Sequence, residues 1–439
     1  MRILILGLGQ YPKGSGVQAA LYFARRGDQV TVYDFFYTPA MDANVKTLKK
    51  YKNVRFVLGK RKLEEVAKAE LIVKHQRIRS TEPEVVEAMR LGKPMESELS
   101  IFLKYCPCKV IGITGTRGKS TTTALTYELL KAGLKQKVWL GGNILLSPLT
   151  FLHRVKAKDV VVLEVSSFQL EGTGAAGVSP QVAVWTNLMP DHLNAYPSMV
   201  EYAEAKAQIF RHQKPDDVVF LPADKGFNGY AASAPGRVIR HGKKGSEAEK
   251  IVSSVKMLLL GEHNLRNAML ATEVALLMGV AKSTIKQVLR TFKGLPDRLQ
   301  VIATKKGIRF VNDTTATTPD ATKVALEALK DTKKIHLIFG GADKELVFEE
   351  IASVLKKQKA RVDIFVLTGT AEGKIRAAFE AKKLAFKVYG SMKEVFIAAV
   401  SNAKKGDTVL LSPGCASFGL FKNEYDRGEQ FVKLVKKWK

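Results

Sequence analysis

The chain has few cysteines and no long apolar run, and each absence excludes a class of protein. Only three of its 439 residues are cysteine, too few for a disulfide scaffold, so we expect a reducing compartment. Cys106-Pro-Cys108 has no second pair of ligands nearby, which argues against a metal site there. The apolar part of the first segment, Arg2 to Leu6, is too short for a signal peptide or a membrane span. We therefore predict a cytoplasmic protein that is not inserted in a membrane.

Acidic residues are also scarce. The chain contains 42 aspartates and glutamates but 70 lysines and arginines, which gives a formal net charge of +28. Such a charge is compatible with nucleic-acid binding, with capture of anionic small substrates, or with a lysine-rich solvated surface. The lysines are spread as pairs such as Lys49-Lys50, Lys305-Lys306 and Lys436-Lys437, and no basic run alternates with aromatic residues. This distribution favours the solvated surface, and no nucleic acid is expected as a partner.

Internal repeats and low-complexity tracts are absent as well, and short apolar runs alternate with helical stretches from end to end. This pattern is typical of α/β folds with parallel sheets. At about 150 residues per domain, the length predicts three domains, which we place at residues 1–105, 106–293 and 294–439. The expected strands cover residues 3–6, 30–33, 54–58, 160–164, 182–186, 218–221, 308–311, 335–339, 364–367 and 409–411.

The most specific motif is the segment Gly112-Ile-Thr-Gly-Thr-Arg-Gly-Lys-Ser-Thr-Thr122, which leads from an apolar run into a predicted helix at 121–131. In such a strand–loop–helix, backbone N–H groups and the helix N-terminus cradle phosphate oxygens. Lys119 would reach the β- and γ-phosphates, and the Ser120 hydroxyl would bind Mg²⁺. The generic loop has glycine where this chain has Ile113, so the shorter form indicates a particular subclass. A glycine-rich turn without a ligand is the alternative, but this motif seldom arises by chance at a strand–helix junction.

Two further polar residues follow predicted strands of the same block. Glu164 closes the apolar run 160–164, and a carboxylate there is the expected second Mg²⁺ ligand, although a surface acid would look the same. His192 follows Asp191 at the exit of the strand at 182–186. A lone histidine is more often structural, but this position favours a metal or substrate role.

The first block opens with glycines of a different kind. Gly7-Leu-Gly9 and Gly14-Ser-Gly16 resemble a dinucleotide-binding loop, but Pro12 stands where the third glycine is required. A nicotinamide cofactor is therefore disfavoured, and a nucleotide-diphosphate site or a plain tight turn is expected instead. Asp34, at the end of the second strand, would either meet ribose hydroxyls or cap the following turn.

Taken in order, the motifs closely resemble the Mur ligases, the ATP-dependent ligases of peptidoglycan precursor assembly, over the whole chain. The segments that carry the resemblance are Gly-Thr-x-Gly-Lys-Ser at 115–120, Glu-x-Ser-Ser-Phe-Gln at 164–169, Asn-x-x-Pro-Asp-His-Leu at 187–193, Ala-Lys-x-x-Ile-Phe at 205–210, Gly-x-His-Asn-x-x-Asn at 261–267, Asn-Asp at 312–313, Gly-Gly at 340–341 and Leu-Ser-Pro-Gly-Cys-Ala-Ser at 411–417. The segment 417–428 and the N-terminal block favour the member that adds D-glutamate over folylpolyglutamate synthases.

The resemblance implies an α/β fold of three domains: a Rossmann-like N-terminal domain for the UDP-linked substrate, a central P-loop ATPase domain with a parallel sheet, and a Rossmann-like C-terminal domain that binds the amino acid. It implies an ADP-forming ligase that adds D-glutamate to UDP-N-acetylmuramoyl-L-alanine through an acyl phosphate, in cytoplasmic peptidoglycan synthesis and so in cell-wall biogenesis, cell shape and cell division. Its partners would be these small molecules, and we expect a monomer.

The resemblance also assigns residues. The ATP site would be formed by Gly115, Thr116, Gly118, Lys119, Ser120, Thr121, Asn267, Arg298 and Asp313. Of two Mg²⁺ sites, the first would be held by Ser120 and Glu164, and the second by His192 and Lys206, with Lys206 carbamylated by CO₂. The catalytic residues would be Lys119, His192, Lys206 and Lys344. Asn143 would contact the sugar nucleotide, and the residues around the amino acid would be Thr317, Ser417, Phe421, Lys344 and His192.

At four positions the chain departs from the family pattern. Arg117 replaces the usual asparagine of the phosphate loop, and Asp297 stands where histidine usually precedes arginine. Thr315 occupies a position usually filled by lysine, and Glu424 one often filled by an aromatic residue. The last two departures keep open a related ligase that uses L-glutamate or another amino acid. A nucleic-acid-stimulated P-loop ATPase and a non-catalytic nucleotide-binding protein are alternatives from other classes.

Overall fold

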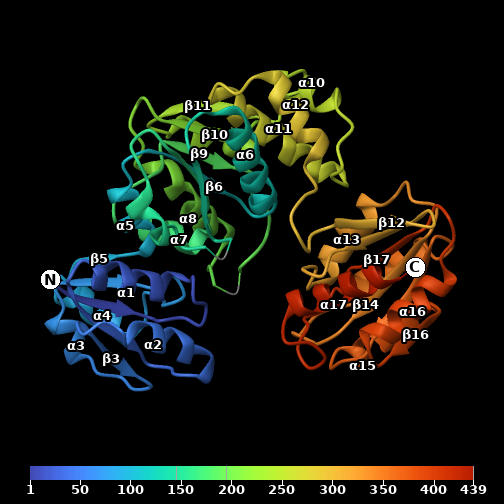
Figure 1. Ribbon diagram of the computed structural model, residues 1–439, viewed down its shortest axis with the longest axis horizontal. Helices are drawn as coiled ribbons and strands as arrows, with labels where there is room; N and C mark the ends of the chain where they lie inside the picture. The colour runs from blue at the N-terminus through green and yellow to red at the C-terminus, as the bar shows by residue number, and fades with distance from the viewer. Residues whose placement is uncertain (145, 194, 439) are drawn as a thin grey trace. The chain divides into compact units, whose positions relative to one another are not determined.

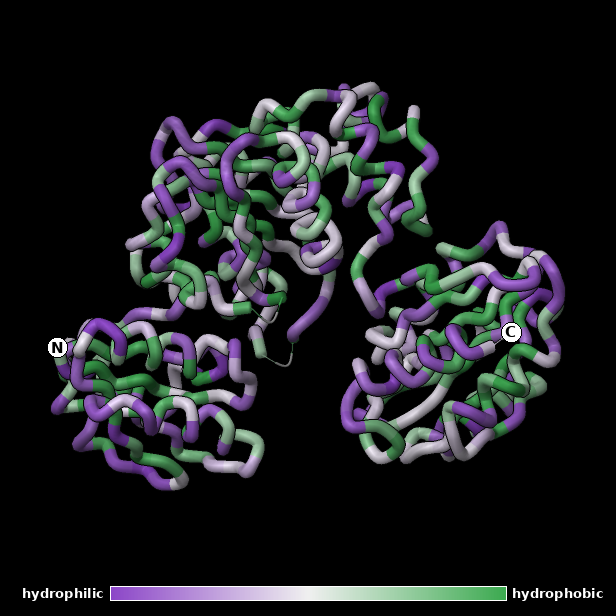
Figure 2. Tube along the Cα trace, viewed as in Figure 1, coloured by the Kyte–Doolittle hydropathy of each residue, from purple (hydrophilic) through white to green (hydrophobic). Residues whose placement is uncertain are grey.

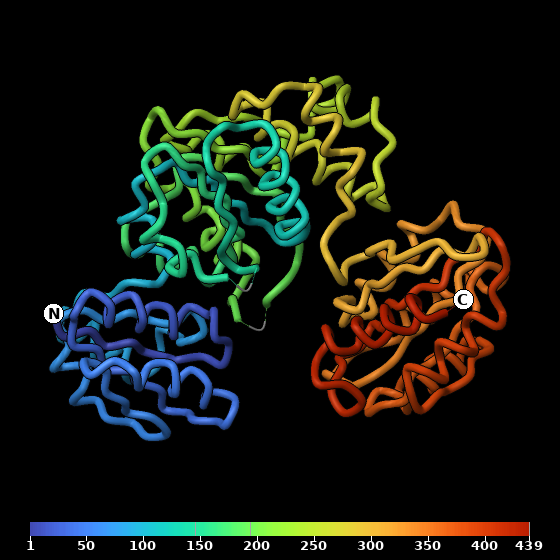
Figure 3. Tube along the Cα trace, viewed as in Figure 1, coloured from blue at the N-terminus to red at the C-terminus, as the bar shows by residue number. Residues whose placement is uncertain are grey.

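The computed structural model describes residues 1–144, 146–193 and 195–438. The chain folds into two compact units, one of residues 1–254 and 267–288 and the other of residues 255–266 and 289–439. Figure 3 follows the chain from one end to the other, and Figure 2 shows that apolar residues concentrate along the central strands of the sheets. None of the helices within the described ranges is long and apolar enough to span a membrane.

The first unit contains two sheets, and the N-terminal one has five parallel strands in the order β3-β2-β1-β4-β5. Its strands are β1 (Arg2–Leu6), β2 (Gln29–Asp34), β3 (Val54–Leu58), β4 (Leu71–Lys74) and β5 (Met95–Glu96). The helices that flank it are α1 (Ser15–Arg25), α2 (Asp42–Leu48), α3 (Glu64–Lys68) and α4 (Pro83–Arg90) (Figure 1). The next helix, α5 (Glu98–Tyr105), packs on α1 and on α7 (Ser167–Ala175). All but the first residue of β1 is buried, because a parallel strand covered by helices on both faces must be apolar throughout.

The second sheet has six parallel strands in the order β11-β10-β9-β6-β8-β7. Its strands are β6 (Lys109–Thr114), β7 (Val138–Gly142), β8 (Val160–Glu164), β9 (Val182–Trp185), β10 (Val218–Pro222) and β11 (Arg237–His241). Its helices are α6 (Lys119–Gly133), α7 (Ser167–Ala175), α8 (Met199–Arg211), α9 (Asn228–Ala232), α10 (Glu247–Ser253), α11 (Glu262–Leu277) and α12 (Lys282–Thr291). One apolar cluster runs through both sheets of the unit, with the rings of Phe102 and Phe151 5.8 Å apart.

The third sheet lies in the second unit and has the order β12-β13-β17-β14-β15-β16. Its strands are β12 (Gln300–Lys305), β13 (Ile308–Asn312), β14 (Ile335–Gly340), β15 (Val362–Leu367), β16 (Phe386–Tyr389) and β17 (Thr408–Leu411). Its helices are α13 (Pro319–Ala328), α14 (Glu349–Lys357), α15 (Glu372–Ala381), α16 (Met392–Asn402) and α17 (Glu424–Lys437). The prediction of an α/β fold with parallel sheets is confirmed, except that β12 pairs antiparallel with β13. The reason is local: Lys306 and Gly307 both have positive φ, 49° and 76°, as a two-residue hairpin turn requires.

The strand register of the second sheet positions the candidate site. Ile113 of β6 lies beside Glu164 of β8, and Thr114 lies beside Trp185 of β9. Because these strands are parallel and end level with one another, the loops that follow them start at the same edge of the sheet. The phosphate loop, Glu164 and the segment after β9 are therefore neighbours, although up to about seventy residues separate them in sequence.

Gly16 provides a test of how α1 packs on the loop that follows β1. A Cβ atom at Gly16 would lie 2.2 Å from the Gly7 carbonyl oxygen and 2.5 Å from that of Leu8. We expect Gly16→Ala to lower the free energy of unfolding by about 1–3 kcal/mol, as overpacking usually does. Gly373→Ala in α15 is the matched control, because no described atom lies within 4 Å of its Cβ position, and there alanine should stabilise by about 0.5–1 kcal/mol. Thermal unfolding followed by circular dichroism measures both, and equal midpoints for Gly16→Ala and the unmodified protein would contradict the packing described.

Candidate active site

The phosphate loop between β6 and α6 depends on two glycines with positive φ, Gly115 at 143° and Gly118 at 80°. A Cβ atom at Gly115 would lie 2.0 Å from Thr186 Oγ1, and one at Gly118 would lie 2.3 Å from Asn267 Oδ1. Both positions therefore require glycine, for conformation and for space. Gly118 is the residue that precedes α6 and has no side chain to cap the helix, so that position leaves the first-turn N–H groups open to an anion. Asn267, which is predicted to contact the nucleotide, lies against the loop at Gly118.

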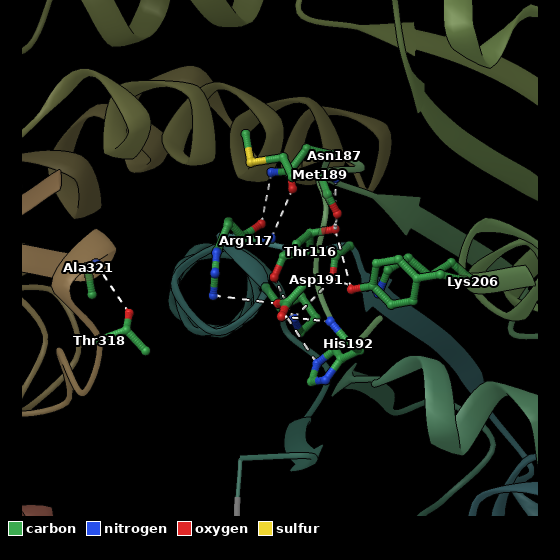
Figure 4. Close-up of polar contacts among 12 residues, drawn as sticks. Thr116, Arg117, Asn187, Met189, Asp191, His192, Lys206, Thr318 and Ala321 are labelled. Carbon is green, nitrogen blue, oxygen red and sulfur yellow. Dashed lines mark hydrogen bonds and ion pairs between the residues drawn. The ribbon is translucent and has the colours of Figure 1, made fainter. Parts of the chain in front are cut away.

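The loop is fastened to the segment that follows β9 (Figure 4). The Thr116 N–H donates to the Asn187 carbonyl oxygen at 3.0 Å, and the Arg117 N–H donates to Asn187 Oδ1 at 2.9 Å. In return, Thr186 Oγ1 donates to the Arg117 carbonyl oxygen at 2.7 Å. The Met189 N–H donates to Thr116 Oγ1 at 3.0 Å. These bonds tie the loop to the segment after β9 at both Thr116 and Arg117.

Two lysines converge on this loop from different helices. The ammonium group of Lys119 donates to the carbonyl oxygens of Gly115 at 2.9 Å and Thr116 at 3.0 Å. Lys206, from α8, donates to the same Gly115 oxygen at 2.9 Å, lies 4.4 Å from the centre of the Tyr202 ring, and is only 1% exposed. Burial first, and then the charge of Lys119, lower the pKa of Lys206 to about 7. Near neutral pH its amine is therefore partly unprotonated and nucleophilic.

Glu164, at the end of β8, has an unsatisfied oxygen. The residue is 3% exposed, and its Oε1 accepts a hydrogen bond from Asn143 Nδ2 at 3.0 Å. Its Oε2 is buried and has no hydrogen-bond partner among the described residues. A buried carboxylate oxygen without a partner is costly, so a cation fits here. The part of the chain that the structure describes holds no cluster of three or more His, Cys, Asp or Glu side chains suited to a metal, so such a cation would need other oxygen ligands as well.

His192 has an unusual backbone conformation, with a φ of 55°, which costs energy for a residue other than glycine. Its ring packs edge-on to Phe168 and Tyr202, with centroids 5.3 Å and 5.9 Å away. Its Nε2 lies 3.8 Å from Asp191 Oδ2. Burial lowers the pKa of His192, Asp191 raises it, and the charges of Lys206, Lys119 and Arg117 lower it further. The net decrease leaves a neutral imidazole at neutral pH, which is the form that binds a metal.

In the second unit, the predicted nucleotide residues Asp313 and Arg298 lie near each other. Asp313 follows β13 and is 7% exposed; its Oδ1 accepts from the Leu299 N–H at 3.0 Å and its Oδ2 from Ser412 Oγ at 2.8 Å. Burial raises the pKa of Asp313 to about 7, against the lowering effect of Ser412, Leu299 and the Arg298 charge. The carboxyl group is therefore poised to ionise when a donor or cation reaches it.

Two of the four departures from the family pattern contact each other. Asp297 has a φ of 65°, and its Oδ1 accepts from Asn312 Nδ2 at 2.8 Å. Its carbonyl oxygen accepts from Thr315 Oγ1 at 2.8 Å. Asp297 and Thr315 thus tie the segment that precedes β12 to the end of β13. This explains why a short hydroxyl side chain suits position 315 in this chain.

The second unit also contains a residue whose importance the sequence analysis did not identify. Arg427, in α17, is fully buried. It donates to Oγ1 and the carbonyl oxygen of Thr314 at 3.0 and 2.8 Å, and to the carbonyl oxygens of Cys415 and Ala416 at 3.1 and 3.2 Å. It therefore joins the loops that follow β13 and β17. The available signal was its spacing of four and eight residues from the apolar Phe431 and Val435, which are buried on the same side of α17.

The residues predicted around the amino acid differ in their surroundings. Ser417 is 3% exposed and Thr317 is half-buried. Lys344, after β14, is exposed, and its ammonium lies 5.2 Å from the centre of the Phe418 ring. Phe421 packs inside the apolar cluster of the third sheet, where it supports the loop that carries Ser417. Bonds between Ala342 and Ala416 join the loops after β14 and β17.

Comparison with known proteins gives consistent matches. A family model described as the Mur ligase middle domain matches residues 113–275, and one described as the Mur ligase, glutamate ligase domain matches residues 297–415. The UDP-N-acetylmuramoylalanine–D-glutamate ligase of Roseiflexus sp. (strain RS-1) is 37% identical over 99% of this chain and 98% of its own. The enzyme of the same name from Acetivibrio thermocellus is 32% identical over 99% and 96%.

Solved structures match at lower identity and bear on the fold alone. The UDP-N-acetylmuramate-alanine ligase MurC of Thermotoga maritima superposes with a TM-score of 0.60 at 20% identity, over 100% of both chains. The MurF ligase of the same organism, in complex with ADP, gives a TM-score of 0.61 at 18% identity, over 98% of this chain and 97% of that one.

The lowered pKa of Lys206 predicts how stability depends on pH. The pKa of Lys206 is about 7 in the folded protein, whereas a lysine in an unfolded chain has a pKa of about 10.4. At a pH between these two values, Lys206 is protonated in the unfolded chain but not in the folded one. The free energy of unfolding should therefore rise with pH across this window, by about 4 kcal/mol from this group. Lys206→Met should remove that part of the rise. Urea unfolding from pH 6.5 to 10.5 in CO₂-free buffer measures both proteins, and parallel pH profiles would contradict the assignment.

Proposed function

The chain belongs to the Mur ligase family, and we propose that it joins D-glutamate to UDP-N-acetylmuramoyl-L-alanine in an ATP-dependent, ADP-forming reaction of peptidoglycan synthesis. The observation that carries the proposal is the full-length identity of 32–37% to enzymes named for this reaction. The glycine-dependent phosphate loop beside a buried, half-satisfied glutamate supports it independently. We place the reaction in the cytoplasm, where ATP and nucleotide-linked sugars are made, and take a monomer as the acting form.

We assign the substrates to three domains, residues 1–105, 106–293 and 294–439. A Rossmann-like N-terminal domain for the UDP group is supported by the strand order β3-β2-β1-β4-β5 and by Gly7 and Gly9, both with positive φ after β1. Asp34 Oδ2 accepts from the Leu8 N–H at 2.9 Å and so shapes this loop. The central domain would bind ATP, and a Rossmann-like C-terminal domain would bind the amino acid.

At the central site, the phosphate loop would bind the triphosphate through its backbone N–H groups, Thr116, Thr121 and Lys119. Lys119 would exchange its two carbonyl partners for the β- and γ-phosphate oxygens, which are stronger acceptors. Asn267 beside the loop would bind the rest of the nucleotide, and Arg298 and Asp313 keep their predicted role as nucleotide-binding residues of the second unit. Mg²⁺ would be held by Ser120 and Glu164, and a second Mg²⁺ by His192 and modified Lys206. When bound, these ions neutralise charge on the phosphate oxygens.

The reaction then needs few covalent steps from the protein. A carboxylate oxygen of the UDP-linked substrate forms a bond to the γ-phosphorus, and the bond from that phosphorus to the ADP oxygen breaks with its electron pair. The amino group of glutamate next attacks the acyl carbon, phosphate leaves, and the nitrogen loses a proton. The protein's task is to position these anions and neutralise their charge. Asn143, which is bonded to Glu164, would orient the sugar-nucleotide carboxylate.

We propose that Lys206 carries a carbamate. Its partly neutral amine would attack CO₂ to give a carbamate and a proton. The reaction would replace a buried cation beside Lys119 with an anion, and that reverses an unfavourable like-charge contact. A carboxylate at the end of the long lysine side chain would also reach the side of the loop where His192 lies (Figure 4).

The acceptor assignment is tested by phosphate release with ATP, Mg²⁺ and UDP-N-acetylmuramoyl-L-alanine. We expect a kcat/KM for D-glutamate at least about a hundredfold above that for L-glutamate, because Lys344, Thr317 and Ser417 would meet two carboxylates whose directions differ between enantiomers. Omission of the nucleotide substrate is the control for uncoupled hydrolysis. A preference for L-glutamate or another amino acid would refute the acceptor but not the ligase chemistry, whereas no turnover with any amino acid would refute the function.

The carbamate has its own test. Lys206→Ala should lose activity by about 10²–10³-fold, the usual cost of one preorganised electrostatic contact, and formate or acetate should restore part of it by replacing the missing carboxylate. Lys206→Gln, which is similar in length and cannot be carbamylated, is the matched variant and should not respond to these acids. A ¹³C carbamate signal in protein equilibrated with ¹³CO₂ is the direct readout. Full activity of Lys206→Ala, or no such signal in the active enzyme, would refute the modification.

A further inference from the structure

Arg117 stands at the tip of the phosphate loop, with a fixed backbone and a movable side chain. Its N–H donates to Asn187 Oδ1, and its carbonyl oxygen accepts from Thr186 Oγ1 at 2.7 Å and from Asn187 Nδ2 at 2.9 Å. The side chain is 64% exposed and extends toward Asp191 (Figure 4). These hydrogen bonds thus fix the backbone of Arg117, while its exposed guanidinium group can exchange its ion-pair partner.

The guanidinium group has only a weak partner. Within the residues that the structure describes, it makes one ion pair, with Asp191 Oδ2 at 3.7 Å, which is longer than a hydrogen bond. An exposed ion pair of this kind stabilises little. Lys119 and Lys206, by contrast, donate to loop carbonyl oxygens at 2.9 Å. Arg117 is therefore the cation of this loop that can be redirected at the lowest cost.

The charge around Arg117 favours an anionic ligand. Lys119 brings a second cation to the same loop, where it donates to the carbonyl oxygens of Gly115 and Thr116, and Asp191 is the acid that pairs with Arg117. Both cations lie at the N-terminus of α6, where the first N–H groups of the helix add positive partial charge. An anion with several oxygens bound there would compete with Asp191 for the guanidinium group.

We propose that Arg117 is a catalytic residue that leaves Asp191 when the nucleotide binds and donates to two oxygens of the transferred phosphoryl group. The proposal rests on the proposed function, in which a carboxylate oxygen bonds to the γ-phosphorus as the bond to the ADP oxygen breaks, ADP keeps the electron pair, and no proton moves. Arg117 forms no covalent bond. Its planar fork matches two phosphate oxygens, and a cation supplied in this way by the same chain stabilises the charge of phosphoryl transfer.

The test compares Arg117→Ala and Arg117→Lys with the unmodified enzyme in the complete ligase assay. We expect Arg117→Ala to lower kcat by about 10²–10³-fold with less than about a threefold change in the KM for ATP, because the contact forms mainly in the transition state. Arg117→Lys should recover part of the loss. Guanidinium chloride at low millimolar concentration should accelerate Arg117→Ala but not Arg117→Lys. Arg211→Ala is the matched control; its side chain pairs with Glu204 at 2.8 Å on α8, and its kcat should stay within about twofold.

A binding measurement separates a catalytic role from a structural one. In the presence of Mg²⁺ and the UDP-linked substrate, ADP with aluminium fluoride should bind Arg117→Ala at least about tenfold more weakly, while a non-hydrolysable ATP analogue should bind normally. Equal binding of the fluoride complex, an unchanged kcat, or a loss of kcat that guanidinium does not restore would each overturn the role of Arg117. If the unmodified enzyme makes no product from any amino acid, the proposed function fails instead, and the two failures are thereby distinguished.

Discussion

Two ammonium groups meet at one carbonyl oxygen, that of Gly115, and the helices that carry them, α6 and α8, both pack on β6. Lys119 reaches it from the start of α6 and Lys206 from the buried face of α8, both at 2.9 Å. The oxygen points this way because Gly115 has a φ of 143° and its Cα lies against Thr186. A side chain at position 115 would clash with Thr186 and separate the loop from β9. Lys119 and Lys206 would then no longer meet at the Gly115 oxygen.

Charged groups near this loop have weak or missing partners. Lys206 donates to a neutral carbonyl group and Arg117 pairs with a distant carboxylate, while Glu164 keeps one buried oxygen without a partner among the described residues. A metal-bound nucleotide would satisfy both at once, because its phosphates are anionic and its metal is cationic. In the free protein these charged groups have weaker partners than phosphate oxygens and a metal ion would be. Exchanging the partners on binding therefore releases free energy.

The features that could be predicted from the sequence are those that depend on residues adjacent to one another along the chain. β8 could be predicted because a buried parallel strand must be apolar throughout, and the phosphate loop because its glycines, Lys119 and Ser120 are contiguous. β12 was not predicted, since none of its residues is fully buried and no apolar run marks it. Arg427 was not given a role because its partner Thr314 is 113 residues away. Likewise, the bond from Thr315 to Asp297 links residues 18 apart through a linker whose path the sequence alone does not determine.

We propose that the phosphate loop and the buried Oε2 of Glu164, which has no partner among the described residues, together bind a metal–nucleotide complex. The most direct test is calorimetric titration of a non-hydrolysable ATP analogue, with and without Mg²⁺, into the unmodified protein and Glu164→Gln. We expect Mg²⁺ to strengthen binding to the unmodified protein by at least about tenfold, or about 1.4 kcal/mol. We expect Glu164→Gln to lose this dependence while binding the metal-free analogue as before. An identical Mg²⁺ dependence in the two proteins would contradict it.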